Sequence, residues 1–254
     1  MQKTAITILL LGLAVYAVAC LALYFLQRSL IYFPPAAAAF PAPATSTLEV
    51  PGAVVKVSER PHAGDKALIY LGGNAEDVTA SLPLLDAAFP QRALYLLHYR
   101  GYTGSSGSPS EQALVADALA LFDRVARQHQ DIVVVGRSLG SGIAVQLASQ
   151  RPVARLVLVT PFDSLPDLAA GQFPFFPVRW LMRDKYACAQ YAPHVSAPTL
   201  IVAAGDDEFI PARSTGLLLS RFAPGVASMR VIRGTGHNTI SSSPDYIPAL
   251  QWAQ

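Results

Sequence analysis

The chain has 254 residues, with 19 Lys and Arg against 17 Asp and Glu, so its net charge is only +2. Charged residues make up 14% of it, compared with roughly 25% in ordinary soluble domains, which indicates that part of the chain avoids water. This balance, without any run of five basic residues, disfavours nucleic acid as a partner. The two cysteines are too few for a metal cluster, and the length suits one catalytic domain.

The first predicted element is an apolar helix over residues 4–26, a stretch of 23 residues without a charged side chain. As a helix it would be about 34 Å long, enough to cross a hydrocarbon core of about 30 Å. A cleaved signal peptide would normally end sooner, so we predict an uncleaved membrane anchor over residues 1–28. A lipoprotein is the alternative, because Ala17-Val18-Ala19-Cys20 resembles a lipoprotein cleavage site.

Residues 29–47 follow the anchor and are rich in alanine and proline. Repeated prolines disfavour helix and favour an extended spacer, so we predict a tether between the anchor and a folded domain over residues 48–254. Basic residues give a weak indication of orientation. Lys3 precedes the span, and Arg28 is the only basic residue among the eighteen after Leu26, which favours a domain on the non-cytoplasmic side.

From residue 48 onward, short apolar runs rich in β-branched residues alternate with helical patterns. Nearly continuous apolar strands separated by helices are typical of an α/β domain with a mostly parallel, doubly wound sheet. The segment between the apolar runs at 156–159 and 200–203 is where this kind of fold often inserts a lid. It is short here, so we expect a small lid or none. Strands are predicted at 54–57, 67–71, 93–99, 132–135, 156–159, 200–203 and 229–232, and helices at 78–88, 112–128, 142–150, 213–222 and 244–252.

The strongest chemical signal is Gly136-Arg137-Ser138-Leu139-Gly140, a G-x-S-x-G pattern. It joins the apolar run 132–135 to a helix of small residues, which is the context of a nucleophile at a sharp strand-to-helix turn. Glycines flank the serine because such a turn brings the backbone too close for side chains. The competing interpretations are an ordinary glycine-rich turn and a dinucleotide-binding loop. Val145, in place of a third glycine, argues against the dinucleotide loop.

A serine hydroxyl needs a base to remove its proton and a carboxylate to orient that base. His237 follows the last predicted strand and is the candidate base. Asp206 and Asp207 follow the strand at 200–203, at the carboxyl edge of the sheet where sites of such sheets form. The order Ser138, Asp, His is that of one hydrolase architecture.

Five motifs occur in one order along the chain, at residues 27–32, 73–77, 99–102, 104–107 and 136–140. With them the chain resembles the alpha/beta-hydrolase superfamily, and in particular the membrane-anchored serine hydrolases that include protein depalmitoylases. The resemblance implies that Asp207, which directly precedes a Glu-x-Ile-Pro segment, is the acid rather than Asp206. It also implies that the backbone amides of Asn74 and Leu139 form the oxyanion hole.

The chain departs from the pattern of that family at three positions. Gly72 stands where the family usually has a histidine that braces the oxyanion loop, His98 stands in place of the usual Asp, and Thr103 in place of the usual Gly. His98 ends a predicted strand, so it is also a minor candidate for a site role of its own. None of these departures removes a catalytic group.

Together, these features predict a single-pass membrane-anchored α/β-hydrolase that cleaves carboxylic esters or thioesters of an acylated small molecule, lipid or protein. In this interpretation Ser138 attacks, His237 transfers protons and Asp207 orients His237, without a metal or an organic cofactor. Two alternatives stay open. One is a serine peptidase of the prolyl-oligopeptidase type, and the other is a catalytically weak, membrane-bound binding module.

Overall fold

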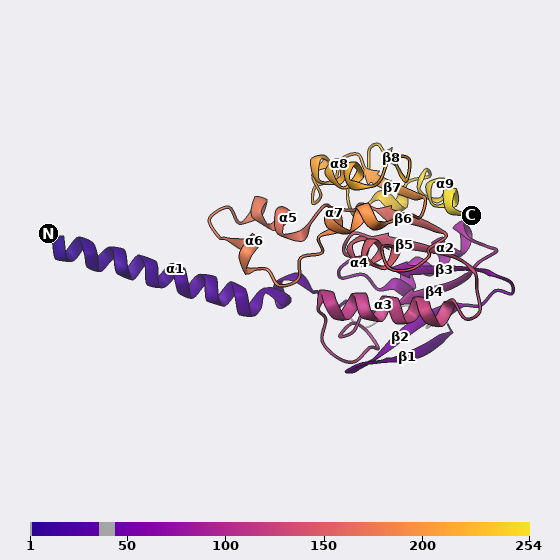
Figure 1. The fold of residues 1–254 in the computed structure, drawn as a ribbon, viewed down its shortest axis with the longest axis horizontal. Coiled ribbons are helices and arrows are strands. Elements are labelled where there is room, and N and C mark those ends of the chain that lie inside the picture. Colours follow the sequence, from indigo (N-terminus) through magenta and orange to yellow (C-terminus); the bar gives the residue numbers. More distant parts are fainter. Residues whose placement is uncertain (1, 36–43) are drawn as a thin grey trace.

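The computed structural model describes residues 2–35 and 44–254, and an eight-stranded sheet runs through its folded domain (Figure 1). The strands are β1 (Thr45–Val50), β2 (Ala53–Arg60), β3 (Lys66–Leu71), β4 (Ala93–Leu97), β5 (Asp131–Arg137), β6 (Arg155–Val159), β7 (Thr199–Ala204) and β8 (Ala227–Ile232). Their order in the sheet is β1-β2-β4-β3-β5-β6-β7-β8. Only the β1–β2 and β2–β4 pairs are antiparallel, which confirms the predicted, mostly parallel sheet.

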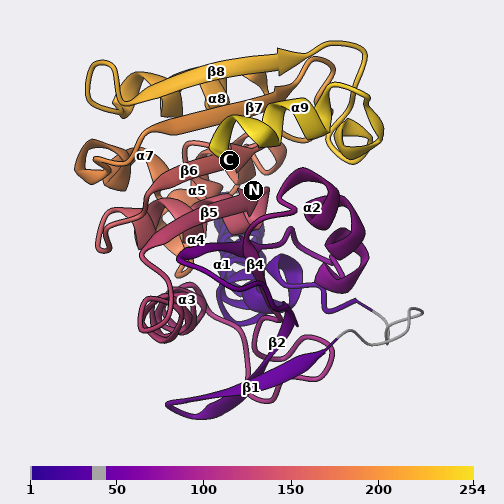
Figure 2. The same cartoon turned by 90° about the vertical axis from the view of Figure 1, so that its right-hand side faces the viewer.

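Helices cover both faces of this sheet, as a doubly wound fold requires. They are α1 (Gln2–Ile31), α2 (Leu82–Ala88), α3 (Glu111–Val125), α4 (Leu139–Ala148), α5 (Leu165–Gln172), α6 (Val178–Leu181), α7 (Cys188–Tyr191), α8 (Ala212–Arg221) and α9 (Tyr246–Leu250). Figure 2 shows α2 and α3 on opposite sides of the strands. In β5, Ile132 and Val134 pack with the core that contains α3 and α4, whereas Val133 and Val135 pack with α2 and α9. Burial on both faces explains the unbroken apolar runs of the sequence.

The sequence analysis predicts no strand at residues 45–50, where the structure has β1. Its residues alternate between exposed and half-buried, so the strand carries little apolar signal. Pairing with β2 through the turn at Pro51-Gly52 satisfies its backbone groups. Residues 45–47 therefore belong to the folded domain and not to the predicted tether.

Helix α1 continues past the predicted anchor boundary at residue 28 and ends at Ile31. Of the helices in the described residues, it alone has the length and apolar composition to cross a membrane, and its apolar window is not buried in the protein. It is therefore a candidate transmembrane span. Residues 36–43 of the predicted tether lie outside the described residues.

The last turns of α1 are docked on the domain rather than followed by a free spacer. The buried Gln27 side chain donates from Nε2 to the Leu181 carbonyl at 3.1 Å and accepts the Arg183 amide at 2.6 Å. Tyr32, the first residue after α1, is almost fully buried in the core that contains α3 and α4. The first residues of the predicted tether are thus part of the folded domain.

A buried carboxylate, Asp184, fixes this end of α1. It accepts hydrogen bonds from Arg28 Nε at 2.9 Å and from the Tyr32 hydroxyl at 3.1 Å. The hydroxyls of Tyr32 and Tyr186 lie 2.8 Å apart. Burial raises the pKa of both phenols, so they stay protonated and the Tyr186 hydroxyl donates to Tyr32 while Tyr32 donates to Asp184.

Arg28→Ala should lower the free energy of unfolding by about 1–3 kcal/mol, because it removes the charged partner of a buried carboxylate. The matched control is Arg151→Ala, which breaks a largely solvated ion pair with Asp123 and should cost less than about 1 kcal/mol. Urea unfolding of both variants in detergent measures the difference. Equal losses would contradict the role given to Asp184.

His98, the minor site candidate, is buried at the end of β4, and its Nε2 lies 2.8 Å from the Ser58 hydroxyl. Burial, together with the positive charge of Lys56, lowers the pKa of His98 from 6.5 to about 4. Between these values the unfolded chain binds a proton at His98 that the folded chain does not. The free energy of unfolding must therefore fall as the pH falls through this window.

We predict that His98→Gln flattens the pH dependence of stability between pH 4 and 6.5, the window set by this shift. In the unsubstituted chain the contribution of His98 over this window is at most about 3 kcal/mol. Urea titrations at several pH values measure it, with His62→Gln as a control because His62 is exposed. An unchanged slope in His98→Gln would show that other groups cause the acid sensitivity.

Candidate active site

Ser138 occupies a sharp turn between β5 and α4, with φ 49° and ψ −116°. A positive φ is strained for a residue with a side chain, and such strain persists only where neighbouring structure enforces it. Two hydrogen bonds do so here. The Ser138 amide donates to the Val159 carbonyl on β6 at 2.9 Å, and its carbonyl accepts the Ser141 amide at 2.9 Å.

The two glycines of the motif stand where other backbone comes very close. A Cβ at Gly140 would lie 2.0 Å from the Leu71 carbonyl oxygen, and a Cβ at Gly136 would lie 2.6 Å from the Ala144 Cβ. Both distances are far below van der Waals contact, so any side chain there would push α4 away from β3 and β5. These close approaches supply the physical reason for the glycines of the motif.

The structure brings the three predicted catalytic residues together at the carboxyl edge of the sheet. Asp207 lies after β7 and His237 after β8. His237 Nδ1 lies 2.9 Å from Asp207 Oδ2, and His237 Nε2 lies 2.9 Å from Ser138 Oγ. With a proton on Nδ1, the imidazole donates to the carboxylate and accepts from the serine hydroxyl, as a general base must.

The Asp207 carboxylate is held by more than the histidine. Burial raises its pKa, but hydrogen bonds from His237 and from the amides of Ile210 and Phe209 outweigh burial and bring the pKa below its ordinary value. Those amides donate to Oδ1 at 2.7 Å and 3.0 Å. Asp206, by contrast, is exposed and is held by its backbone amide, which donates to the Thr235 carbonyl.

The two amides predicted for the oxyanion hole lie near Ser138. Leu139 begins α4 directly after the serine, and Asn74 lies in the oxyanion loop (residues 72–77) after β3. A Cβ at Gly73 would be 3.7 Å from the Ser138 Cβ, so this loop passes beside the candidate nucleophile. Within residues 2–35 and 44–254, neither the Asn74 nor the Leu139 amide hydrogen-bonds another protein group, so both are available to a bound oxygen.

Glu76 braces the oxyanion loop from within. One of its carboxylate oxygens accepts the Gly73 amide at 2.7 Å and the Arg137 guanidinium at 3.0 Å. The other accepts the hydroxyls of Tyr70 and Ser81, each at 2.7 Å. This one side chain therefore connects the loop to β3 and to the residue before Ser138.

Gly72, where the resembling family usually has a histidine, has no room for one in this structure. Even a Cβ there would lie 2.6 Å from Val78 Cγ1. Instead, the Tyr99 hydroxyl donates to the Gly72 carbonyl at 2.7 Å, and Glu76 holds the next amide. The support expected from the histidine comes from these two side chains.

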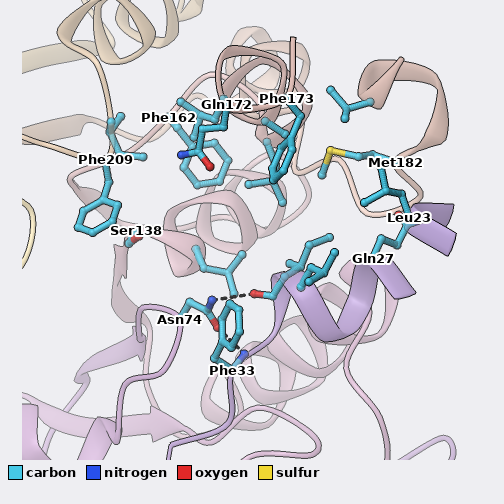
Figure 3. Close-up of a pocket in the computed structure, with 18 of the residues that line it drawn as sticks. Leu23, Gln27, Phe33, Asn74, Ser138, Phe162, Gln172, Phe173, Met182 and Phe209 are labelled. Atoms are coloured by element: carbon cyan, nitrogen blue, oxygen red, sulfur yellow. Dashed lines mark hydrogen bonds between the residues drawn. The ribbon is translucent and has the colours of Figure 1, made fainter. Parts of the chain in front are cut away.

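The Asn74 side chain joins the oxyanion loop to the end of α1. Its Nδ2 donates to the Ile31 carbonyl at 2.7 Å, and its Oδ1 accepts the Phe33 amide at 3.0 Å and the Tyr102 hydroxyl at 2.7 Å. Figure 3 shows the bond to α1 as a dashed line. Movement of the helix end would therefore be transmitted to the candidate oxyanion hole.

A cavity of about 490 Å³ opens beside Ser138, within the size range of small-ligand sites. One wall is α1, through Leu23, Gln27 and Leu30. The opposite wall is the cap (residues 165–182), which contains α5 and α6 (Figure 3). The lining is mostly apolar, so the cavity suits a hydrocarbon chain.

Sequence reasoning gave no individual role to Gln27, Tyr32 or Glu76. All three lie in the motifs at 27–32 and 73–77, so the sequence marked these segments but did not show what the individual side chains contact.

The other histidines stand apart from the candidate triad. His129 is buried against the Tyr95 hydroxyl and the Gly64 carbonyl, and His62 and His194 are exposed.

Comparison with known proteins identifies relatives that match between half and 84% of this chain. A protein of Mycobacterium tuberculosis, described as uncharacterized, is 36% identical over 230 residues, covering 84% of this chain and 80% of the relative. The lysophosphatidylserine lipase ABHD12 of Macaca fascicularis is 32% identical over 146 residues, but the match covers only 50% of this chain and 37% of the lipase.

Solved structures share the same architecture. The Pyrococcus furiosus esterase Pf2001 superimposes with a TM-score of 0.71 at 15% identity, covering 88% of this chain and 98% of the esterase.

The family model described as alpha/beta hydrolase fold matches residues 66–192, half of the chain. The chain therefore belongs to the alpha/beta-hydrolase fold family, and this membership supports activity as a hydrolase.

Proposed function

We propose that this protein is a membrane-anchored serine hydrolase that cleaves carboxylic esters or thioesters of acylated substrates. One observation carries the proposal: two hydrogen bonds of 2.9 Å link Asp207 through His237 to Ser138, at the mouth of an apolar cavity. A packing role would not require a strained serine to face this cavity. A binding module would not require the histidine and the carboxylate behind it.

In the proposed first half-reaction, Ser138 Oγ attacks the acyl carbon while His237 Nε2 takes the hydroxyl proton. The oxygen of the tetrahedral intermediate accepts hydrogen bonds from the Asn74 and Leu139 amides. His237 then passes its proton to the leaving alcohol or thiol as the carbon–oxygen or carbon–sulfur bond breaks. The acyl group remains on Ser138.

In the second half-reaction, water attacks the acyl-enzyme and His237 Nε2 takes a proton from it. The same proton returns to Ser138 Oγ as the carboxylic acid leaves. Asp207 stays ionised throughout and stabilises the imidazolium through Nδ1. All these steps use side chains, backbone amides and water.

The apolar cavity supports an acylated substrate. Each methylene that it takes from water contributes about 0.8 kcal/mol, so a medium or long chain should bind better than acetyl. The name of one relative, a lysophosphatidylserine lipase, agrees with this class of substrate. Helix α1 would hold the protein in the membrane, with the domain on the non-cytoplasmic side, which the sparse basic residues after the span favour.

The central prediction is that Ser138→Ala abolishes labelling by a fluorophosphonate probe and hydrolysis of medium-chain acyl esters. His237→Ala should lower turnover by a factor of about 10⁴–10⁶, because members of a triad act as a unit. Rates are measured on the full-length chain in detergent with a panel of esters, thioesters and peptides. Ser141→Ala is the matched control, since its hydroxyl bonds the Ser138 carbonyl and does not contact His237.

Labelling that survives in Ser138→Ala would refute the assigned nucleophile. A chain that is never labelled would favour the binding module. Peptide hydrolysis faster than ester hydrolysis would favour the peptidase.

Asp207→Asn should lower turnover far more than Asp206→Asn. Of these two carboxylates, that of Asp207 reaches His237 Nδ1, and an amide in its place can turn its NH₂ group toward the ring and favour the wrong tautomer. By analogy with other triads the loss is about 10⁴-fold, whereas Asp206→Asn changes an exposed side chain. The ratio of the two kcat values decides between them. The reverse order would reassign the acid to Asp206.

A further inference from the structure

The cap carries large apolar side chains that the protein itself does not cover. Phe175 is 85% exposed, Trp180 is 89% exposed, and Phe173, also in the cap, is 45% exposed. Figure 1 shows α5 and α6 projecting from the domain on the same side as α1. Neighbouring aromatic side chains left in water would be costly, so this surface requires a partner.

The cap lies against the part of α1 that should be inside the bilayer. The Tyr16 hydroxyl donates to the Phe175 carbonyl at 2.8 Å. The Tyr16 and Phe176 rings stack, with centroids 5.8 Å apart and planes 9° apart. Nearer the domain, the Arg183 guanidinium lies 5.9 Å from the centroid of the Tyr24 ring, and basic and aromatic side chains of this kind mark the headgroup level.

The position of Tyr16 along α1 gives the depth of these contacts. A hydrocarbon core of about 30 Å that begins at Thr4 ends near residue 24. Tyr16 then lies about 12 Å inside the boundary on the domain side, since each helical residue rises about 1.5 Å. A loop that contacts Tyr16 must enter the same leaflet.

The chemistry of the cap is compatible with that depth. Residues 174 and 177 are prolines without an amide hydrogen, and the amides of Phe173, Phe176 and Val178 donate to nearby carbonyls. The loop therefore exposes few unpaired backbone donors to lipid. Two charged side chains of the cap, Arg179 and Asp167, are paired at 2.7 Å, as charges at membrane depth usually are.

We propose that the cap is inserted in the bilayer beside α1, and that the acyl chain of a membrane-resident substrate enters the cavity laterally from the lipid. The partner of the exposed aromatic surface is thus the membrane itself. The cavity lies between α1 and the cap, and its α1 wall begins at Leu23, within one residue of the end of the hydrocarbon core near residue 24. The entry route rests on the proposed function, whereas the insertion of the cap does not.

The two tryptophans of the chain make insertion measurable without a label. Trp180 is on α6, whereas Trp252 lies near the C-terminus. There the Gln254 carbonyl accepts a hydrogen bond from Arg155 at the amino end of β6, and the candidate site lies at the carboxyl ends of the strands. We expect the full-length chain in phosphatidylcholine vesicles with brominated acyl chains to lose most of its Trp180 emission. Trp252→Phe isolates that signal, and Trp180→Phe is the matched control, whose emission should hardly change.

Insertion is overturned if both single-tryptophan variants are quenched equally. It is also overturned if aqueous iodide quenches Trp180 in vesicles as well as in the unfolded chain. Neither readout requires hydrolysis, so a failure of the proposed function would leave this test intact.

The entry route is tested with Phe175→Glu, which places a charge in the inserted loop but outside the cavity lining. Hydrolysis of a long-chain ester held in vesicles should fall about tenfold, because the loss of one buried aromatic is worth at least that factor. Hydrolysis of a short, water-soluble ester should not change. Met229→Glu, on exposed β8, is the matched control and should alter neither rate. Equal losses on both substrates in Phe175→Glu would overturn lateral entry.

Discussion

The structure depends on the burial of one carboxylate, Asp184, whose partners come from a segment near the N-terminus. Asp184 follows the cap in the sequence and is buried, and a buried negative charge is costly unless donors reach it. Arg28 and Tyr32 supply those donors from the end of α1 and the residue after it. The apolar helix is thereby fixed to the domain, and its last turns become one wall of the cavity beside Ser138.

A second constraint connects that docking to the site. The Asn74 side chain binds Ile31 and Phe33, while its own amide is a candidate donor to the oxyanion. Glu76 connects the same loop to Arg137, directly before Ser138, the candidate nucleophile. The end of α1, the oxyanion loop and the turn at Ser138 therefore form one hydrogen-bonded unit, although they are far apart in the sequence. Such preorganisation is what electrostatic stabilisation of a transition state requires.

The sheet and the arrangement of the candidate triad could be predicted from sequence because their signals are local. An apolar strand followed directly by the G-x-S-x-G pattern specifies the turn at Ser138. Asp207 and His237 each follow a strand of the same sheet. The docking of α1 could not be predicted, because it rests on tertiary contacts between Arg28 and Asp184, 156 residues apart. The helices of the cap were missed because α5 is short with a proline in its first turn, and the four-residue α6 follows a run of prolines and aromatics.

The docking of α1 has a consequence for how such a protein can be divided or recombined. An anchor joined by a free spacer could be exchanged for any other membrane helix without effect on the enzyme. Here the junction lies inside a continuous helix: Tyr16 contacts the cap, whereas Leu23 and Gln27 line the cavity and Gln27 also bonds the domain. The segment that must stay together with the folded domain therefore begins within the helix, about two turns before its end.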